Sequence, residues 1–212
     1  MTEPTTLERN NITGLVLAGG QGTRMGGLDK GLIEFKGREM IAWVLDAFQP
    51  QVAEVVISAN RNIDRYRGTG AQVVSDAGEG FAGPLAGIAS GLRACPRPYL
   101  AVVPCDGPFV PADLVSRLGQ AFETDGIEIA AAHDGERLHP TFALIDRTVL
   151  ADLDAYLAEG GRKVQEFYFM RKFAQVDFSD CPGAFLNVNT PGDMERAGFG
   201  PGAKRTAKGE KQ

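Results

Sequence analysis

Residues 12–30 read I-T-G-L-V-L-A-G-G-Q-G-T-R-M-G-G-L-D-K, an apolar run followed directly by a glycine-rich loop that ends in a cation. The apolar run from Ile12 to Leu17 predicts a buried strand. The glycines after it leave backbone N–H groups free to approach anionic oxygens closely. Arg24 and Lys30 add positive charge beside those N–H groups. The stretch therefore predicts a phosphate-binding loop at the end of a strand.

Two common phosphate loops nearly fit this stretch, and neither does so fully. A dinucleotide-binding fingerprint requires G-x-G-x-x-G, but after Gly20 and Gly22 the third glycine position holds Met25. A P-loop requires G-K-[ST] at its end, but Gly27 is followed by Leu28. A simple glycine-rich turn would explain the glycines, but not the two cations at the end of a buried strand, where open α/β sheets bind ligands. We expect a different type of phosphate loop.

The motif L-A-G-G-x-G-x-R-M-G, followed by a lysine, resembles the opening motif of nucleotidyltransferases, which transfer a nucleotide monophosphate from an NTP to a phosphorylated acceptor. Five later segments narrow the resemblance to the molybdenum cofactor guanylyltransferase family. They are S-A-N-R at 58–61, G-P-L-A-G at 83–87, C-D-G-P-F at 105–109, H-D-G-E-R-L-H-P-T at 133–141 and N-V-N-T-P at 187–191. The resemblance spans about residues 12–197 and implies an α/β, Rossmann-like nucleotidyltransferase (glycosyltransferase-A-like) fold.

The implied reaction is transfer of GMP from GTP to molybdenum-molybdopterin, which forms the molybdopterin guanine dinucleotide cofactor and releases pyrophosphate. Proteins of molybdenum cofactor biosynthesis or molybdoenzyme maturation are implied as partners. Two alternatives stay open at this stage. One is a cytidylyltransferase acting on the same pterin or on a sugar-alcohol phosphate, and the other is a non-catalytic GTP-binding adapter of the same pathway.

Individual residues acquire expected roles from the loop and from the resemblance. The lysine matching Lys30 contacts nucleotide phosphates in the family, and Arg24 offers a planar fork for phosphate oxygens. With Asp106 these two form the expected catalytic set. The residues expected to bind the nucleotide are Leu17, Ala18, Gly19, Gly20, Gly22, Lys30, Asn60, Asp76 and Asp106.

Asp106 follows an apolar strand and precedes Gly107 and Pro108, so its carboxylate should emerge at the carboxyl edge of the sheet. A turn or helix-capping role is the structural alternative. An NTP arrives with Mg²⁺, which typically takes only one or two protein carboxylates together with phosphate oxygens and water. The resemblance points to the same residue, so we expect Asp106 to be the Mg²⁺ ligand.

Asn60 and Asp76 end the second and third expected strands and can line the same edge. Either one alone is easily explained as a turn residue. A carboxylate can accept from the N1–H and N2–H groups of guanine, and an amide can both accept and donate. The family has nucleotide contacts at both positions, and which residue contacts the base and which the ribose stays open.

The acceptor is expected to bind in the second half of the chain. A polar hairpin tip explains Asp134, Arg137 and His139 on structural grounds, and the functional interpretation is a surface for the pterin phosphate. Asn187 and Asn189 lie two residues apart, so on a strand they would face the same side, where they could bond a pterin or simply satisfy backbone groups. We expect these five residues to bind the acceptor.

Composition limits the remaining possibilities. The 212 residues, 43% of them hydrophobic, can bury the core of one α/β domain. The net charge of −5 argues against a nucleic-acid binder. A signal peptide and a run of transmembrane length are both missing from the sequence, so we expect a cytoplasmic protein without a membrane partner. Cys105 is interpreted as a buried thiol and not a nucleophile, because the neighbouring carboxylate raises a thiol pKa.

Apolar β-branched runs alternate with helical periodicity, which predicts a three-layer fold with a mostly parallel sheet and helices on both faces. We expect further strands at 54–59, 72–75, 99–104 and 174–178, and helices at 41–48, 85–94, from about 111, at 148–158 and at 163–170. The segments 127–132 and 140–145 flank the polar turn D-G-E-R and predict a hairpin excursion. We expect a flexible N-terminus at 1–11, one nucleotidyltransferase domain at 12–198, and a disordered tail at 199–212.

Overall fold

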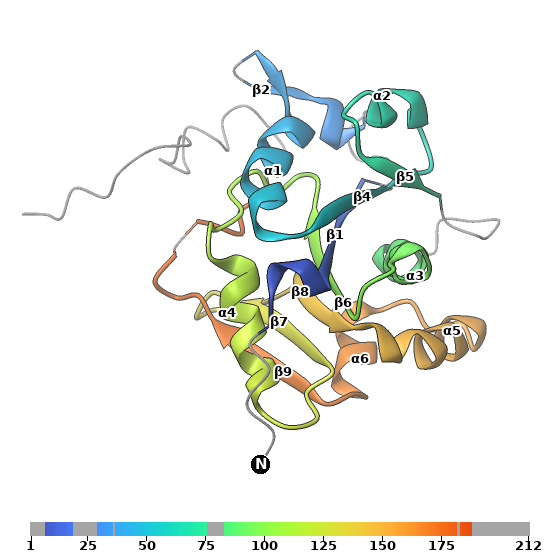
Figure 1. Ribbon diagram of the computed structural model, residues 1–212, viewed down its shortest axis with the longest axis vertical. Coiled ribbons are helices and arrows are strands. Elements are labelled where there is room, and N and C mark those ends of the chain that lie inside the picture. Colours follow the sequence, from blue (N-terminus) through green and yellow to red (C-terminus); the bar gives the residue numbers. More distant parts are fainter. Residues whose placement is uncertain (1–6, 19–28, 36, 76–82, 182, 188–212) are drawn as a thin grey trace, which may run out of the picture.

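A seven-stranded sheet forms the centre of the computed structural model, with strand order β5-β4-β1-β6-β8-β7-β9 (Figure 1). The structure describes residues 7–18, 29–35, 37–75, 83–181 and 183–187. The sheet strands are β1 (Ile12–Leu17), β4 (Glu54–Ser58), β5 (Gln72–Val74), β6 (Tyr99–Pro104), β7 (Ile129–His133), β8 (Leu138–Asp146) and β9 (Phe173–Asp177). A separate two-stranded hairpin joins β2 (Glu34–Phe35) to β3 (Arg38–Glu39).

The first half of the sheet is parallel. Strand β1 pairs in parallel with β4 and β6, and β4 pairs in parallel with β5. Strand β8 runs antiparallel to both β6 and β7, while β7 and β9 are parallel. The predicted hairpin is therefore present, and its two strands continue the main sheet. The carboxyl ends of β1, β4 and β6 lie at one edge, since Leu17 is in register with Ser58 and with Pro104.

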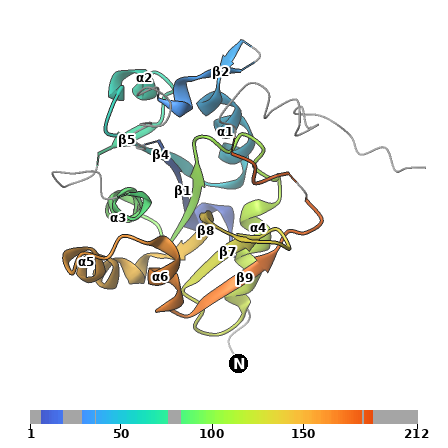
Figure 2. The same ribbon diagram turned by 180° about the vertical axis from the view of Figure 1, so that it is seen from behind.

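Helices cover both faces of the sheet, which confirms the predicted three-layer architecture. They are α1 (Met40–Phe48), α2 (Ile63–Arg67), α3 (Pro84–Ala94), α4 (Leu114–Gln120), α5 (Leu150–Ala158) and α6 (Val164–Phe169). In Figure 1, α1 and α4 lie to the left of the sheet and α3 and α5 to the right, and Figure 2 shows the same layers from behind. Because neighbouring strand residues face opposite sides, Val16 packs in the core under α1 and α4, and Leu15 in the core under α3.

The long periodic segments form the elements that their patterns predict. Helix α1 buries Ile41, Val44, Leu45 and Phe48, the positions of the predicted apolar stripe. Helix α4 begins at Leu114, three residues after Pro111, because the intervening residues form a turn in which the Leu114 N–H donates to the Pro111 carbonyl. The β2–β3 hairpin and the five-residue α2 were not predicted, since elements this short contain too little periodicity to recognise.

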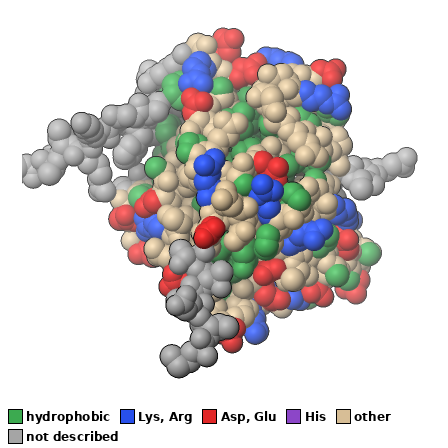
Figure 3. Space-filling view, viewed as in Figure 1, with side chains coloured by type: hydrophobic (Ala, Val, Ile, Leu, Met, Phe, Trp, Pro, Cys, Tyr) green, Lys and Arg blue, Asp and Glu red, His purple; other side chains and the backbone are tan. Residues whose placement is uncertain are grey.

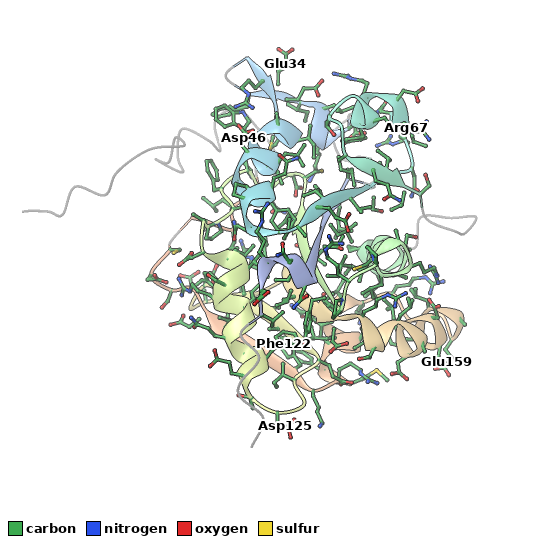
Figure 4. All side chains as sticks on the ribbon, in the orientation of Figure 1. Glu34, Asp46, Arg67, Phe122, Asp125 and Glu159 are labelled. Atoms are coloured by element: carbon green, nitrogen blue, oxygen red, sulfur yellow. The ribbon has the colours of Figure 1, made fainter. Side chains whose placement is uncertain are left out.

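Side chains fill the spaces between the layers, while the labelled Glu34, Asp125 and Glu159 point outward (Figure 4). On the face shown in Figure 3, basic and acidic side chains are interspersed. Near the start of the chain, η1 (Arg9–Asn11) is tied to the domain because Arg9 Nε donates to the Val52 carbonyl at 2.7 Å. Within the described residues, no helix combines the length and the hydropathy that crossing a membrane requires.

Candidate active site

Three chain segments meet where the central parallel strands end. The Ala18 N–H donates to the Ser58 carbonyl at 2.8 Å, and the Cys105 N–H donates to the Leu17 carbonyl at 3.0 Å. These bonds continue the sheet for one residue beyond β1 and β6. Ala18, Asn60 and Asp106, which follow these strands, therefore lie at one edge of the sheet. This is the edge at which open α/β sheets bind ligands.

Lys30 and Asp106 form an ion pair at this edge. The Lys30 Nζ atom lies 2.8 Å from Asp106 Oδ2, although the two residues are 76 positions apart in the sequence. Lys30 is the first residue of η3 (Lys30–Leu32), and Asp106 is the second residue after β6. The Lys30 side chain is 32% exposed and that of Asp106 only 12%, so the carboxylate is largely removed from water while the lysine side chain is partly exposed. The structure thus brings together two of the three residues predicted to be catalytic.

The surroundings of Asp106 fit a divalent cation that arrives with a nucleotide. The carboxylate already has one cation beside it, since the Lys30 ammonium lies 2.8 Å away. Within the described part of the chain, no group of three or more His, Cys, Asp or Glu side chains could enclose a metal ion. A single carboxylate suits Mg²⁺, which completes its coordination with phosphate oxygens and water, better than it suits a metal caged by protein alone.

The other predicted nucleotide contacts are described only in part. Leu17 ends β1, Ala18 is buried directly after it, and Asn60 is half-buried after β4. Five predicted residues lie outside the described residues: Gly19, Gly20, Gly22, Arg24 and Asp76. The roles assigned to all of these residues stay predictions.

Cys105 lies beside Asp106 and is buried, as expected for a thiol that fills space in the core. Burial raises the pKa of the Cys105 thiol, and the charge of the adjacent Asp106 carboxylate raises it further. The thiol therefore stays protonated at neutral pH, and only the thiolate is a good nucleophile. The geometry supports no covalent role for Cys105.

The predicted acceptor residues Asp134, Arg137 and His139 lie at the β7–β8 turn. Asp134 Oδ1 accepts from the backbone N–H groups of Glu136 and Arg137 at 2.9 and 2.8 Å, and Asp134 Oδ2 lies 2.6 Å from His139 Nε2. Burial alone would raise the pKa of Asp134, but the hydrogen bonds from His139 and the turn backbone hold it well below its usual range. Asp134 thus organises the hairpin, and the Arg137 side chain is exposed.

An aromatic cluster connects this hairpin to the segment that carries Asn187. Phe185 stacks on the His139 ring at 4.7 Å and contacts Phe142 edge-on at 4.9 Å. Phe142 also packs against the turn that holds Asp106, because a Cβ atom on Gly107 would lie 2.7 Å from Phe142 Cζ. The cluster thus connects the turn that holds Asp106 to the segment that carries Asn187. Asn187 is exposed two residues beyond Phe185, and Asn189 lies outside the described residues.

Three residues next to the ion pair were not singled out from the sequence. Asp29 accepts hydrogen bonds from Tyr66 Oη at 2.5 Å and from Asn62 Nδ2 at 3.0 Å. A sequence signal was present, since Asp29 directly precedes Lys30 and Asn62 directly follows the S-A-N-R segment. Neither residue type is diagnostic by itself, because Asp and Asn are common in turns.

Comparison with known proteins identifies relatives of the chain. The family described as MobA-like NTP transferase domain matches residues 14–174. The molybdenum cofactor guanylyltransferase of Cupriavidus pinatubonensis is 46% identical over 189 residues, which cover 87% of this chain and 94% of that protein.

Solved structures share the fold. Molybdopterin-guanine dinucleotide biosynthesis protein A from Archaeoglobus fulgidus is similar with a TM-score of 0.71 at 24% identity, covering 87% of this chain and 96% of that one. The Rv0371c protein of Mycobacterium tuberculosis, solved in complex with manganese, has a TM-score of 0.62 at 19% identity, covering 89% of this chain and 98% of that one.

Proposed function

Because the chain belongs to the MobA-like NTP transferase family, we propose that it transfers GMP from GTP to molybdenum-molybdopterin. The products are the molybdopterin guanine dinucleotide cofactor and pyrophosphate. The terminal phosphate of the pterin attacks the α-phosphorus of GTP in line, and the bond to the pyrophosphate leaving group breaks. The observation that best supports this reaction is the Lys30–Asp106 pair at the carboxyl edge of three parallel strands.

The chain's own residues contribute positioning and charge. The Lys30 ammonium and the Arg24 guanidinium neutralise phosphate oxygens, and the loop N–H groups hold those oxygens in place. A protein nucleophile is unnecessary because the acceptor phosphate is itself ionised near neutral pH. This agrees with the protonated state of the Cys105 thiol.

We propose Mg²⁺ as the metal and Asp106 as its protein ligand. When bound, the ion would neutralise charge that develops on the phosphate oxygens. Asp106 is suited to this role because its carboxylate is largely buried and lies beside an ammonium that can move toward the phosphates. Lys30 therefore balances the charge of Asp106 before the nucleotide binds.

The acceptor is proposed to bind across the β7–β8 turn and the segment after Phe185. The stacking of Phe185 on His139 supports this, because it brings Asn187 and the hairpin into one neighbourhood. Arg137 is the exposed cation of that neighbourhood and is proposed to contact the pterin phosphate, with Asn187 and Asn189 contacting the pterin. The free thiols of Cys95, Cys105 and Cys181 suit a reducing compartment, and we propose the cytoplasm.

The function is tested by pyrophosphate release with GTP, CTP and ATP in the presence of molybdenum-molybdopterin. We expect release with GTP that depends on the pterin and on Mg²⁺. A preference for CTP would establish the cytidylyl alternative. GTP binding without any release of pyrophosphate would identify the chain as a binding adapter.

A further inference from the structure

The exit of the glycine-rich loop is anchored to a part of the chain more than thirty positions away. Tyr66 Oη donates to Asp29 Oδ1 at 2.5 Å across 37 positions, and Asn62 Nδ2 donates to Asp29 Oδ2 at 3.0 Å across 33 positions. Both Asp29 carboxylate oxygens are thus engaged by the segment that contains α2. Lys30, the next residue, contacts Asp106 on the other side.

The two donors are themselves held in place. Tyr66 is fully buried, and burial raises the pKa of its hydroxyl, with the hydrogen bond to Asp29 and the charge of that carboxylate raising it further. The hydroxyl therefore remains a donor throughout the neutral pH range. Asn62 precedes α2 with a φ of 50°, and among the described residues it is the only non-glycine residue with positive φ. Asparagine adopts this left-handed conformation more readily than most residues, and from it the Asn62 amide reaches Asp29.

We propose that Asp29, Tyr66 and Asn62 are positioning residues that set the Lys30 ammonium for the nucleotide phosphates. The inference rests on the proposed role of Lys30 in binding phosphate. A lysine side chain is long and has many rotamers, so a fixed backbone at its base is required to aim its ammonium. Small errors of placement are costly, because a displacement of about 1 Å from the productive geometry can cost about 100-fold in rate.

The same anchor couples two parts of the nucleotide site. Asn62 is two residues after Asn60, which is predicted to contact the base or ribose. Its bond to Asp29 links that segment to the phosphate loop directly, in addition to the sheet hydrogen bonds between β1 and β4. Asn62 therefore connects the segment that carries Asn60 to the residue that precedes Lys30.

The first test compares Tyr66→Phe, which removes only the hydroxyl, with Tyr168→Phe as a matched control. Tyr168 is also fully buried, and its hydroxyl donates to the Pro140 carbonyl at 3.0 Å. We expect Tyr66→Phe to lower kcat/KM for GTP by about 10- to 100-fold. We expect the same fold loss of kcat/KM with inosine triphosphate, because contacts to the phosphates do not depend on which base the nucleotide carries. Tyr168→Phe should leave kcat/KM unchanged, and melting temperatures report whether either variant is merely less stable.

The second test asks whether the effect passes through Lys30. In a Lys30→Ala background, Tyr66→Phe should lower kcat/KM by less than about twofold, since the group being positioned is gone. A Tyr66→Phe effect of full size in that background would overturn the inference, as would a Tyr66→Phe enzyme with wild-type kinetics. If wild type and Tyr168→Phe both fail to release pyrophosphate from GTP, the proposed function fails and this inference with it.

A pair of variants at Asp29 separates positioning from general packing. Asp29→Ala removes both acceptor oxygens and should lower kcat/KM by about 10-fold or more. Asp29→Asn keeps the size of the side chain, leaves an oxygen that accepts from Tyr66, and offers an N–H donor to which the Asn62 amide oxygen can turn. Asp29→Asn should therefore retain most of the activity. An Asp29→Asn variant as impaired as Asp29→Ala would contradict the assignment.

Discussion

Gly31 packs against Tyr66 so closely that a Cβ atom on Gly31 would lie 2.6 Å from Tyr66 Oη and 3.2 Å from Cys105 Cβ. The residue after Lys30 is therefore a glycine for a steric reason. Any side chain there would push against the hydroxyl that binds Asp29 and against the strand extension that leads to Asp106. At Gly31 the segment that carries Lys30 thus packs directly against the residue that precedes Asp106.

Gly31→Ala should destabilise the fold by about 1–3 kcal/mol, because the added methyl group overpacks a buried site. It should also lower turnover, since relieving the clash moves Tyr66 or Cys105. Gly119→Ala is the control: it lies in α4, and its Cβ would meet Leu7 Cβ at 3.4 Å, an ordinary contact. Urea unfolding and pyrophosphate release measure both effects. A Gly31→Ala variant as stable as Gly119→Ala would contradict the steric argument.

Asp106→Asn should keep the fold and lower kcat by about 100-fold or more, because the amide retains the size of the side chain but loses the charge that holds Mg²⁺. The exposed Asp113→Asn is the control. Circular dichroism checks the fold, and rates are measured over a range of Mg²⁺ concentrations. Near wild-type activity of Asp106→Asn at limiting Mg²⁺ would refute the metal assignment.

Lys30→Ala and Arg24→Ala should lower kcat/KM by a similar factor for every accepted NTP, because both residues are proposed to contact phosphate and not the base. The ratio of GTP to CTP activity should stay as in the wild type. Steady-state kinetics with both nucleotides measure this. If Lys30→Ala instead changes the ratio of GTP to CTP activity, Lys30 contacts the base and its assignment to the phosphates is wrong.

Asp76, which lies outside the described residues, is predicted to accept from guanine N1–H and N2–H. Asp76→Ala should then weaken use of GTP sharply and barely affect CTP, since a site built around hydrogen bonds rejects a base that lacks them. Inosine triphosphate lacks only the N2 amine and should fall between the two. Equal wild-type kcat/KM for GTP and CTP is the outcome that would end the guanylyl assignment.

Asp134 should make the free energy of unfolding fall as the pH is lowered into the acidic range. Its pKa is lower in the folded state than the unfolded value of about 3.9, so its stabilisation is present above pH 4 and is lost as the pH falls further. Asp134→Asn should therefore cost about 1–3 kcal/mol in the free energy of unfolding at pH 5, and less at pH 3.5. The control is Asp125→Asn, whose exposed side chain points outward in Figure 4. An Asp134→Asn cost that does not shrink with acid would contradict this account.

The sequence by itself determined the alternation of strands and helices and the position of Asp106 at a strand end. These follow from apolar periodicity and from the turn residues that bound it, which are properties of neighbouring residues. The phosphate loop stays a prediction from glycine spacing. Strand β6 begins and ends at Tyr99 and Pro104 as the pattern predicts. The family resemblance supplied the substrate, because no local pattern identifies a pterin.

Only the tertiary structure decided which of these residues meet. Strand order places β6 directly beside β1, which brings Asp106 to Lys30 from 76 positions away. The same folding brings Tyr66 and Asn62 to Asp29, and Phe185 to His139. Such contacts depend on pairing order and register, which a single sequence does not encode in any local window. For that reason the chemistry of the site could be predicted residue by residue, while the anchoring of Lys30 became visible only in the fold.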